Sequence, residues 1–192
     1  RVFVSGTVSG GGPSLPMHVG GLAGEAAFTN ISEVTTTVKI QYTVESTSFG
    51  GGILGKANNC TISNSSSTGG QVSNYEYMGG LVGSMTGGAI TNCYSANQFL
   101  NTKTVGGLIG AKDNVLVNSS YFDKDIAGAA SESSEGKTTA QMRQRRTFGD
   151  WDFSGIWRIG EGETYPTLRW RRLTEDNPLE LFYLLTDWDF IK

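Results

Sequence analysis

The stretch Met78-Gly79-Gly80-Leu81-Val82-Gly83 decides the fold of this chain, because its centre, Gly-Gly-Leu-x-Gly, occurs four times, once with Ile for Leu. The copies begin at Gly20, Gly51, Gly79 and Gly106, and the spacings between them are 31, 28 and 27 residues. Self-similarity at such a period indicates a stacked repeat architecture. It favours an extended structural protein over a compact enzyme.

The glycines have a physical role in this pattern. Glycine reaches φ > 0 without penalty and lets one backbone approach another closely, so the motif predicts a corner that recurs in every coil. A phosphate-binding loop is a poor alternative, because no copy is followed by Lys-Ser or Lys-Thr and no strand–loop–long-helix pattern surrounds them.

A second anchor lies in phase with the first. Eleven residues after each first glycine stands a β-branched aliphatic residue, of the type that suits a half-buried strand. The predicted structural repeat therefore consists of Gly20, Gly21, Leu22, Ile31, Gly51, Gly52, Ile53, Ile62, Gly79, Gly80, Leu81, Ile90, Gly106, Gly107, Leu108 and Val117. Asn64 and Asn92 also share a position and are candidates for a side-chain ladder between coils.

One such unit cannot bury its own apolar face, but stacked units bury a continuous ladder. We therefore predict an all-β fold: a β-solenoid, similar to a parallel β-helix, of about four coils with parallel in-register pairing and an aromatic-rich C-terminal cap. Alternation of Thr36, Val38, Ile40 and Tyr42 with polar residues supports strands.

Composition narrows the class of protein. The 192 residues include 27 glycines and 4 prolines, charged residues make up 17%, and the net charge is −3. This balance argues against a nucleic-acid partner. No apolar run approaches the roughly 18 residues that span a bilayer, so we expect no membrane-spanning segment. The start at Arg1, inside a repeat-like stretch, leads us to expect a mature product or a fragment.

Metal and thiol chemistry have few candidates. His18 is the single histidine and no Cys-x-x-Cys occurs, so neither a metal, a cofactor nor a catalytic Cys–His pair is expected. Cys60 and Cys93 lie at different offsets in their repeats, which makes two small buried residues a better interpretation than a disulfide.

The chain changes character after the repeats. We predict a repeat solenoid over residues 1–122, a polar loop with a short helix over 123–147, and a Trp- and Arg-rich cap over 148–192. Thr138 and Gln141 have the spacing of a capping box, and Gly149 is a candidate helix end. Residues 179–185 are compatible with a helix or a strand, and Asp150-Trp151-Asp152-Phe153 recurs at 187–190.

The Trp-rich segment is expected to pack on the last coil through Trp151, Trp157 and Trp170, whereas no cap is evident at the N-terminal end. The arginines of this segment could form a basic–aromatic patch, but pairing with acidic neighbours is the preferred interpretation. The residues concerned are Arg143, Arg145, Arg146, Arg169, Arg171 and Arg172, with Glu161, Glu163, Glu175 and Asp176.

The unit around residues 78–83, continued by Ile90-Thr91-Asn92-Cys93-Tyr94-Ser95, resembles the GLUG-motif repeat of bacterial surface and secreted proteins. The resemblance extends over roughly residues 1–170, and the tail from Ser120 to Trp170 is similar to the usual ending of that family. Gly50, where the other units have Val or Met, and the stretch 171–192 depart from it. The resemblance implies a large exported protein, often adhesin-like or haemagglutinin-like. The same motif occurs in some secreted immunoglobulin A peptidases, outside their catalytic part. It carries no catalytic residues.

Three functions follow as hypotheses. The first is a secreted or cell-surface structural and adhesion module, without catalysis, whose partner is a host or cell-surface protein or glycan. The second is a filament subunit that stacks end to end with copies of itself. The third is a polysaccharide-active enzyme, for which the candidate carboxylates are Asp113, Asp123, Asp125, Glu132 and Glu135.

Overall fold

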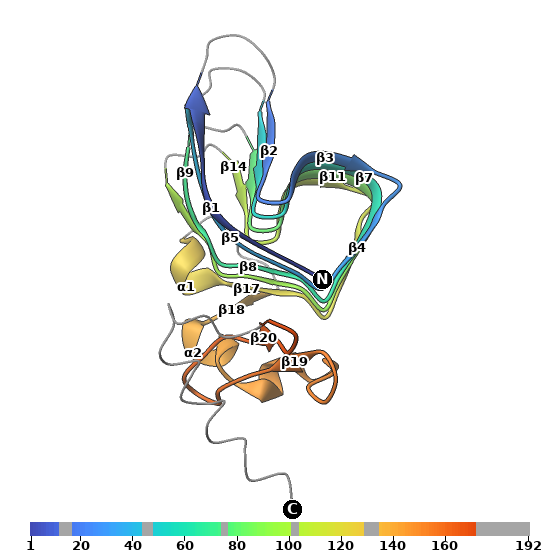
Figure 1. The fold of residues 1–192 in the computed structure, drawn as a ribbon, viewed down its shortest axis with the longest axis vertical. Helices are drawn as coiled ribbons and strands as arrows, with labels where there is room; N and C mark the ends of the chain where they lie inside the picture. The colour runs from blue at the N-terminus through green and yellow to red at the C-terminus, as the bar shows by residue number, and fades with distance from the viewer. Residues whose placement is uncertain (12–16, 44–47, 74–76, 101–103, 129–134, 172–192) are drawn as a thin grey trace, which may run out of the picture.

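The computed structural model describes residues 1–11, 17–43, 48–73, 77–100, 104–128 and 135–171. Strands from successive repeats stack as the parallel rungs of a β-solenoid, and Figure 1 looks along that stack. The predicted all-β solenoid is confirmed. Four glycine motifs lie one above another, and the chain makes about three turns between the first and the last.

The middle wall of the coil, the glycine sheet, holds the short strands that end at the first glycine of each motif. They are β2 (His18–Gly20), β6 (Phe49–Gly51), β10 (Tyr77–Gly79) and β14 (Thr104–Gly106). Gly20 lies opposite Gly51, Gly51 opposite Gly79 and Gly79 opposite Gly106. The chain then bends at the second glycine and the residue after it, and enters the next wall.

The second wall, the outer sheet, follows each motif. Its strands are β3 (Ala23–Ala27), β4 (Asn30–Ser32), β7 (Leu54–Ser63), β11 (Val82–Thr91), β15 (Ile109–Asp113) and β16 (Leu116–Asn118). Ile31, Ile62, Ile90 and Val117 lie opposite one another across it. At the bend, Leu22, Ile53, Leu81 and Leu108 are joined rung to rung by backbone hydrogen bonds of 2.8–2.9 Å.

The third wall, the base sheet, closes the coil. Its strands are β1 (Val2–Gly11), β5 (Val34–Thr43), β8 (Ser66–Ser67), β9 (Gly70–Ser73), β12 (Tyr94–Ser95), β13 (Gln98–Leu100), β17 (Tyr121–Asp123) and β18 (Gly136–Lys137). All pair in parallel. The expected alternation is present in β5, where Thr36, Val38 and Ile40 are buried.

At the second glycine of each motif the backbone packs directly against the base sheet, and this close contact is here called the pinch. A Cβ on Gly52 would lie 2.1 Å from Ser67 Oγ, and one on Gly80 would lie 2.0 Å from Ser95 Oγ. Across the pinch, Ser95 Oγ donates to the Gly107 carbonyl at 2.7 Å. The pinch divides the interior into two cores, because apolar residues pack separately on its two sides.

The first and third glycines are also fixed by contact. A Cβ on Gly79 would lie 1.8 Å from the Val82 carbonyl oxygen, and one on Gly55 would lie 2.4 Å from the Val19 nitrogen. No motif glycine has a positive φ in the described residues. Of the two reasons the sequence offered for these glycines, close backbone approach is therefore correct and positive φ is wrong.

The non-glycine residues with positive φ, together with Gly87, lie at two other corners of the coil. One corner holds Phe28, Asn59, Gly87 and Asn114, with φ between 49° and 66°. The other holds Glu33, Asn64, Asn92 and Ser119, with φ between 42° and 52°. Asn tolerates this region better than most side chains, which explains its recurrence. The predicted Asn64–Asn92 side-chain ladder is not formed, since Asn64 Oδ1 is buried without a hydrogen-bond partner.

After β17 the chain leaves the coil and forms the side module. Its elements are α1 (Lys124–Ala127), α2 (Thr139–Met142), the 3-10 helix η1 (Arg145–Phe148), β19 (Trp157–Arg158) and β20 (Thr167–Leu168). The predicted capping box is confirmed: the Gln141 N–H donates to the Thr138 hydroxyl, and the Thr138 N–H donates to the Gln141 side chain. Gly149 directly follows η1.

Apart from α1, which contacts β13 and buries Ala127 against the core of the coil, the side module lies beside the base sheet, on the outside of the coil (Figure 1). Trp151 Nε1 donates to the Ser119 carbonyl at 2.7 Å, which joins the module to the last coil, as expected for this residue. Tyr94, one rung earlier, donates to the Pro166 carbonyl at 2.8 Å, and Arg171 lies 4.3 Å from the ring centre of Phe3 on β1. The module therefore runs along several rungs. The second Asp-Trp-Asp-Phe copy and residues 179–185 lie outside the described residues.

Candidate functional site

Three rings form a column on the outer face of the glycine sheet, here called the aromatic strip. His18, Phe49 and Tyr77 begin β2, β6 and β10 and lie opposite one another in the register. The ring centres of His18 and Phe49 are 5.4 Å apart, and those of Phe49 and Tyr77 are 5.5 Å apart. All three side chains are half-buried, so part of each ring faces solvent.

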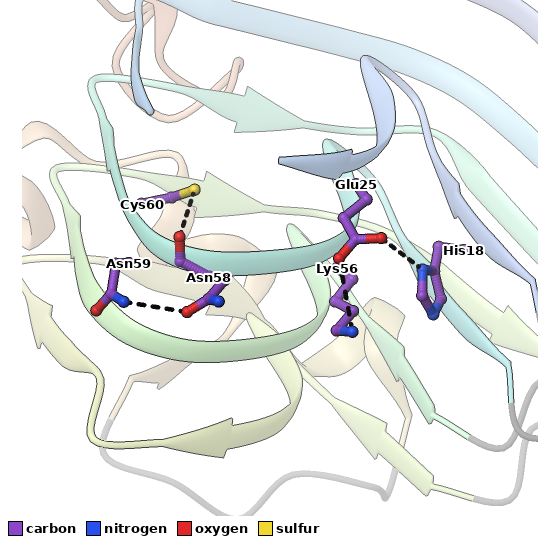
Figure 2. A network of polar contacts seen from close by, with 6 residues as sticks. All are labelled: His18, Glu25, Lys56, Asn58, Asn59 and Cys60. Carbon is purple, nitrogen blue, oxygen red and sulfur yellow. Dashed lines mark hydrogen bonds and ion pairs between the residues drawn. The ribbon is translucent and has the colours of Figure 1, made fainter. Parts of the chain in front are cut away.

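A polar row runs along the outer sheet beside the strip. Glu25, Lys56 and Ser84 are register partners on β3, β7 and β11. Glu25 accepts from His18 Nδ1 at 3.3 Å and lies 3.5 Å from Lys56 Nζ, so one carboxylate bridges the two walls (Figure 2). The Glu25 side chain is 52% exposed and that of Lys56 41%, which leaves both heads available to solvent.

Rings beside charged groups and hydroxyls can bind a partner in two ways. Apolar ring surface packs on the C–H face of a sugar or on an apolar side chain, while Glu25, Lys56 and Ser84 exchange hydrogen bonds with polar groups. Because the rungs repeat at about 4.8 Å, these groups are arranged along a line. An elongated partner, such as a glycan chain or an extended peptide, matches that arrangement.

Sequence reasoning missed this strip, although the signal was present. His18, Phe49 and Tyr77 each stand two residues before the first glycine of a motif, and Thr104 is the fourth member. A column of three ring residues in phase is visible in the sequence. Treating His18 only as a possible metal ligand or base concealed it.

The candidate carboxylates of the enzyme hypothesis are only partly brought together. Asp123 is fully buried. Asp125 lies close to it, since Thr139 bonds to both: the Thr139 hydroxyl donates to Asp123 and the Thr139 backbone N–H donates to Asp125. Asp113 lies on the outer sheet, at the end of β15. Glu135 lies beside β17, where its carbonyl accepts from the Phe122 N–H, and Glu132 is outside the described residues.

Asp123 has a structural task that occupies both its oxygens. Oδ1 accepts from the backbone N–H groups of Asp125 and Ile126, which caps α1. Oδ2 accepts from the hydroxyls of Thr139 and Tyr165, which ties the side module to the last coil. Burial, together with the hydrogen bond to Asp123, raises the pKa of Tyr165 to about 12, so this hydroxyl remains a donor at neutral pH.

The arginines do not pair with acidic neighbours as predicted. Among the described residues, none of Arg143, Arg145, Arg146, Arg169 and Arg171 forms an ion pair with an acidic side chain. Arg143 lies over the ring of Tyr165 and Arg145 over that of Phe153. The apolar rings of this compact module compete for the guanidinium groups. Arg172, Glu175 and Asp176 lie outside the described residues.

Both cysteines are buried free thiols, which confirms the interpretation that they are small buried residues. Cys93 Sγ donates to the Thr91 carbonyl at 3.2 Å, and burial raises the pKa of this thiol to about 12. A protonated, inaccessible thiol is a poor nucleophile. Cys60 makes the matching contact to the Asn58 carbonyl at 3.4 Å (Figure 2).

Within the described ranges, no three His, Cys, Asp or Glu side chains gather in a way that could hold a metal ion. The helices in the same ranges are too short and too polar to cross a bilayer.

Comparison with known proteins agrees with this geometry. The stacked glycine corners define the class, a glycine-rich parallel β-solenoid. A family model, "The GLUG motif", matches residues 74–98, so the chain contains a GLUG motif, in agreement with its resemblance to that repeat. No solved structure matches the chain.

A curated relative is similar to about half of the chain. It is the "Putative Gly-rich membrane protein" of Evansella cellulosilytica, 39% identical over 112 residues that cover 52% of this chain. The match covers 12% of the length of that relative, so the chain spans only a small part of it.

Proposed function

We propose that this chain is a non-catalytic module of a cell-surface or secreted protein, in which the solenoid is a rigid support and the aromatic strip contacts a glycan or a protein. The GLUG motif and the solenoid fit a repetitive, extracellular-type module. The observation that carries the adhesive part is the strip itself: three half-buried rings in register beside a solvent-exposed Glu–Lys pair.

The absence of catalysis is part of the proposal. It is supported by the buried position of Asp123, whose oxygens accept four hydrogen bonds from groups of the fold. A general acid or base needs a proton within reach of substrate, and this carboxylate is enclosed. Hydrolysis of acidic polysaccharides that is lost in Asp123→Asn, in a variant that still folds, would revive the enzyme hypothesis.

The test is binding of the purified chain to a glycan array and to immobilised extracellular-matrix proteins, with the double variant Phe49→Ala/Tyr77→Ala. We expect the variant to lose at least about tenfold in affinity, equivalent to about 1.4 kcal/mol. Phe28→Ala is the matched control, because Phe28 is a 79% exposed ring at another corner of the coil.

Equal affinity of the double variant and the wild type would remove the strip from the binding site. A wild-type chain that binds none of these probes would contradict the adhesive role and leave a passive spacer. The filament alternative is tested separately, by negative-stain electron microscopy over a concentration series, where regular fibres would favour it.

A further inference from the structure

At the C-terminal end of the solenoid a cavity adjoins the interior of the last coil. In the described part of the chain, β14, β15 and β16 are each paired on one side only. Five apolar residues, the last glycine motif, Lys112 and Glu135 line a cavity of about 250 Å³ at this end. The apolar residues are Val105, Leu108, Ile109, Val117 and Phe122.

Lys112 stands in an interior column at this end. Its register partner is Met85, which in turn lies opposite Ala57, and Ala57 lies opposite Ala26. Ala57 and Met85 are each 1% exposed, whereas Lys112 is exposed and lines the cavity. Register partners in a parallel ladder project to the same face, so the last rung of an apolar column is a lysine.

This lysine changes what the end can bind. Its alkyl stem can cover apolar surface while the ammonium group remains in water. A further coil stacked on β15 would enclose the ammonium group in an apolar column, in the cavity that Glu135 also lines. Removing such charges from water is unfavourable, and the desolvation cost can exceed the attraction even between paired charges. Inward-pointing charges, Lys above all, are a known protection of sheet edges.

The base sheet is blocked at the same end by the chain itself. β18 pairs in parallel with β17, with Gly136 opposite Phe122 and Lys137 opposite Asp123. This edge would receive the base strand of a further coil. Thr139, two residues after β18, donates to Asp123 and Asp125 and so fixes the strand in place.

We infer that the C-terminal end of the solenoid is a terminator, at which Lys112 and β18 exclude a further coil from another copy of the chain. Lys112 acts on the outer sheet and β18 on the base sheet, so two walls of the coil are protected by separate means. The inference is independent of the aromatic strip and ranks the filament alternative below the adhesive module.

The experiment compares wild type with Lys112→Met, which continues the column of Met85, by light scattering coupled to size exclusion over a hundredfold concentration range. We expect wild type to remain monomeric and Lys112→Met to associate at least tenfold more tightly. Lys112→Arg, which keeps the charge, and Lys124→Met, which removes an exposed lysine of α1, are controls expected to behave as wild type.

Two results would overturn the inference. One is a folded Lys112→Met variant that has the monomer mass at every concentration. The other is a wild-type chain that forms end-to-end oligomers by itself. Ala57→Lys tests the column independently. An ammonium group two rungs inside the stack cannot reach water, so we expect a large fall in the unfolding midpoint of this variant. An unchanged midpoint would place the column outside the interior.

Discussion

Each coil turns at residues with left-handed backbone, and one of them has an unsuitable side chain. Phe28 has φ 51° at the corner where the other coils have Asn59, Gly87 and Asn114. Its ring is 79% exposed, so little packing compensates for the strain. We expect Phe28→Asn to raise the free energy of unfolding by about 1 kcal/mol.

Chemical denaturation of the two chains measures this difference. Asn59→Phe, the reverse change at the equivalent corner, is the matched variant and should lower stability by a similar amount. Equal midpoints for Phe28→Asn and the wild type would show that the corner is not strained.

The close contact at the pinch leads us to predict that a side chain at its glycine destabilises the fold. In Gly52→Ala the new methyl group would overlap Ser67 Oγ and, at 2.3 Å, the Gly80 carbonyl oxygen. Neither wall can move without breaking rung-to-rung hydrogen bonds, so we expect a loss of about 3 kcal/mol or failure to fold.

Gly149→Ala is the control for the pinch, because a Cβ there meets no atom within 4 Å. Thermal unfolding followed by circular dichroism measures both variants. Similar midpoints would contradict the argument that close approach, rather than glycine content in general, explains the motif.

Among the elements, the side module is fixed by two tryptophans with different polar contacts. Trp151 Nε1 donates to the Ser119 carbonyl, whereas Trp157 Nε1 is buried without a partner. Replacement by Phe removes ring volume in both cases but a hydrogen bond in only one. We expect Trp151→Phe to cost about 1 kcal/mol more than Trp157→Phe.

Urea denaturation of the two variants gives the comparison, and each is the control for the other. A greater loss in Trp157→Phe would show that ring packing, and not the contact with Ser119, holds the module to the last coil.

The sequence predicted the stacked walls because phase carries that information. Ile62 and Ile90 stand at the same distance along the sequence from the first glycine of their motifs, and parallel stacking places such equivalent residues opposite each other. It could not predict the pinch, since the contact of Gly80 with Ser95 joins two walls whose distance no period encodes. The position of the side module was hidden for a similar reason. In the sequence Tyr94 has the pattern of an ordinary strand residue, and only the structure shows that its hydroxyl donates a hydrogen bond to the Pro166 carbonyl.

At the scale of the whole molecule, buried groups that titrate at alkaline pH make stability depend on pH. Burial raises the pKa of the Cys93 thiol in the folded chain from its ordinary value of 9.0 to about 12. Between these values the unfolded chain releases a proton that the folded chain retains, so rising pH favours unfolding. Stability should fall by up to about 1.4 kcal/mol per pH unit above pH 9 from this group.

Denaturation at pH 8, 9 and 10 compares wild type with Cys93→Ala. We expect the variant to be less stable at pH 8, because it loses the thiol contacts with Thr91 and Ile62, and its stability to decline less steeply with pH. Parallel curves for the two chains would mean that the thiol ionises equally well when folded.

The contact between Arg171 and Phe3 has a mechanical consequence. A solenoid pulled along its axis is loaded one rung after another, so the weakest ladder opens first. The side module joins the last coil through Trp151 and the first rung through Arg171, and it therefore forms a second load path that runs in parallel with the ladders. Force applied along the axis would be shared between the strand ladders and the side module, and a single rung could open without separating its neighbours.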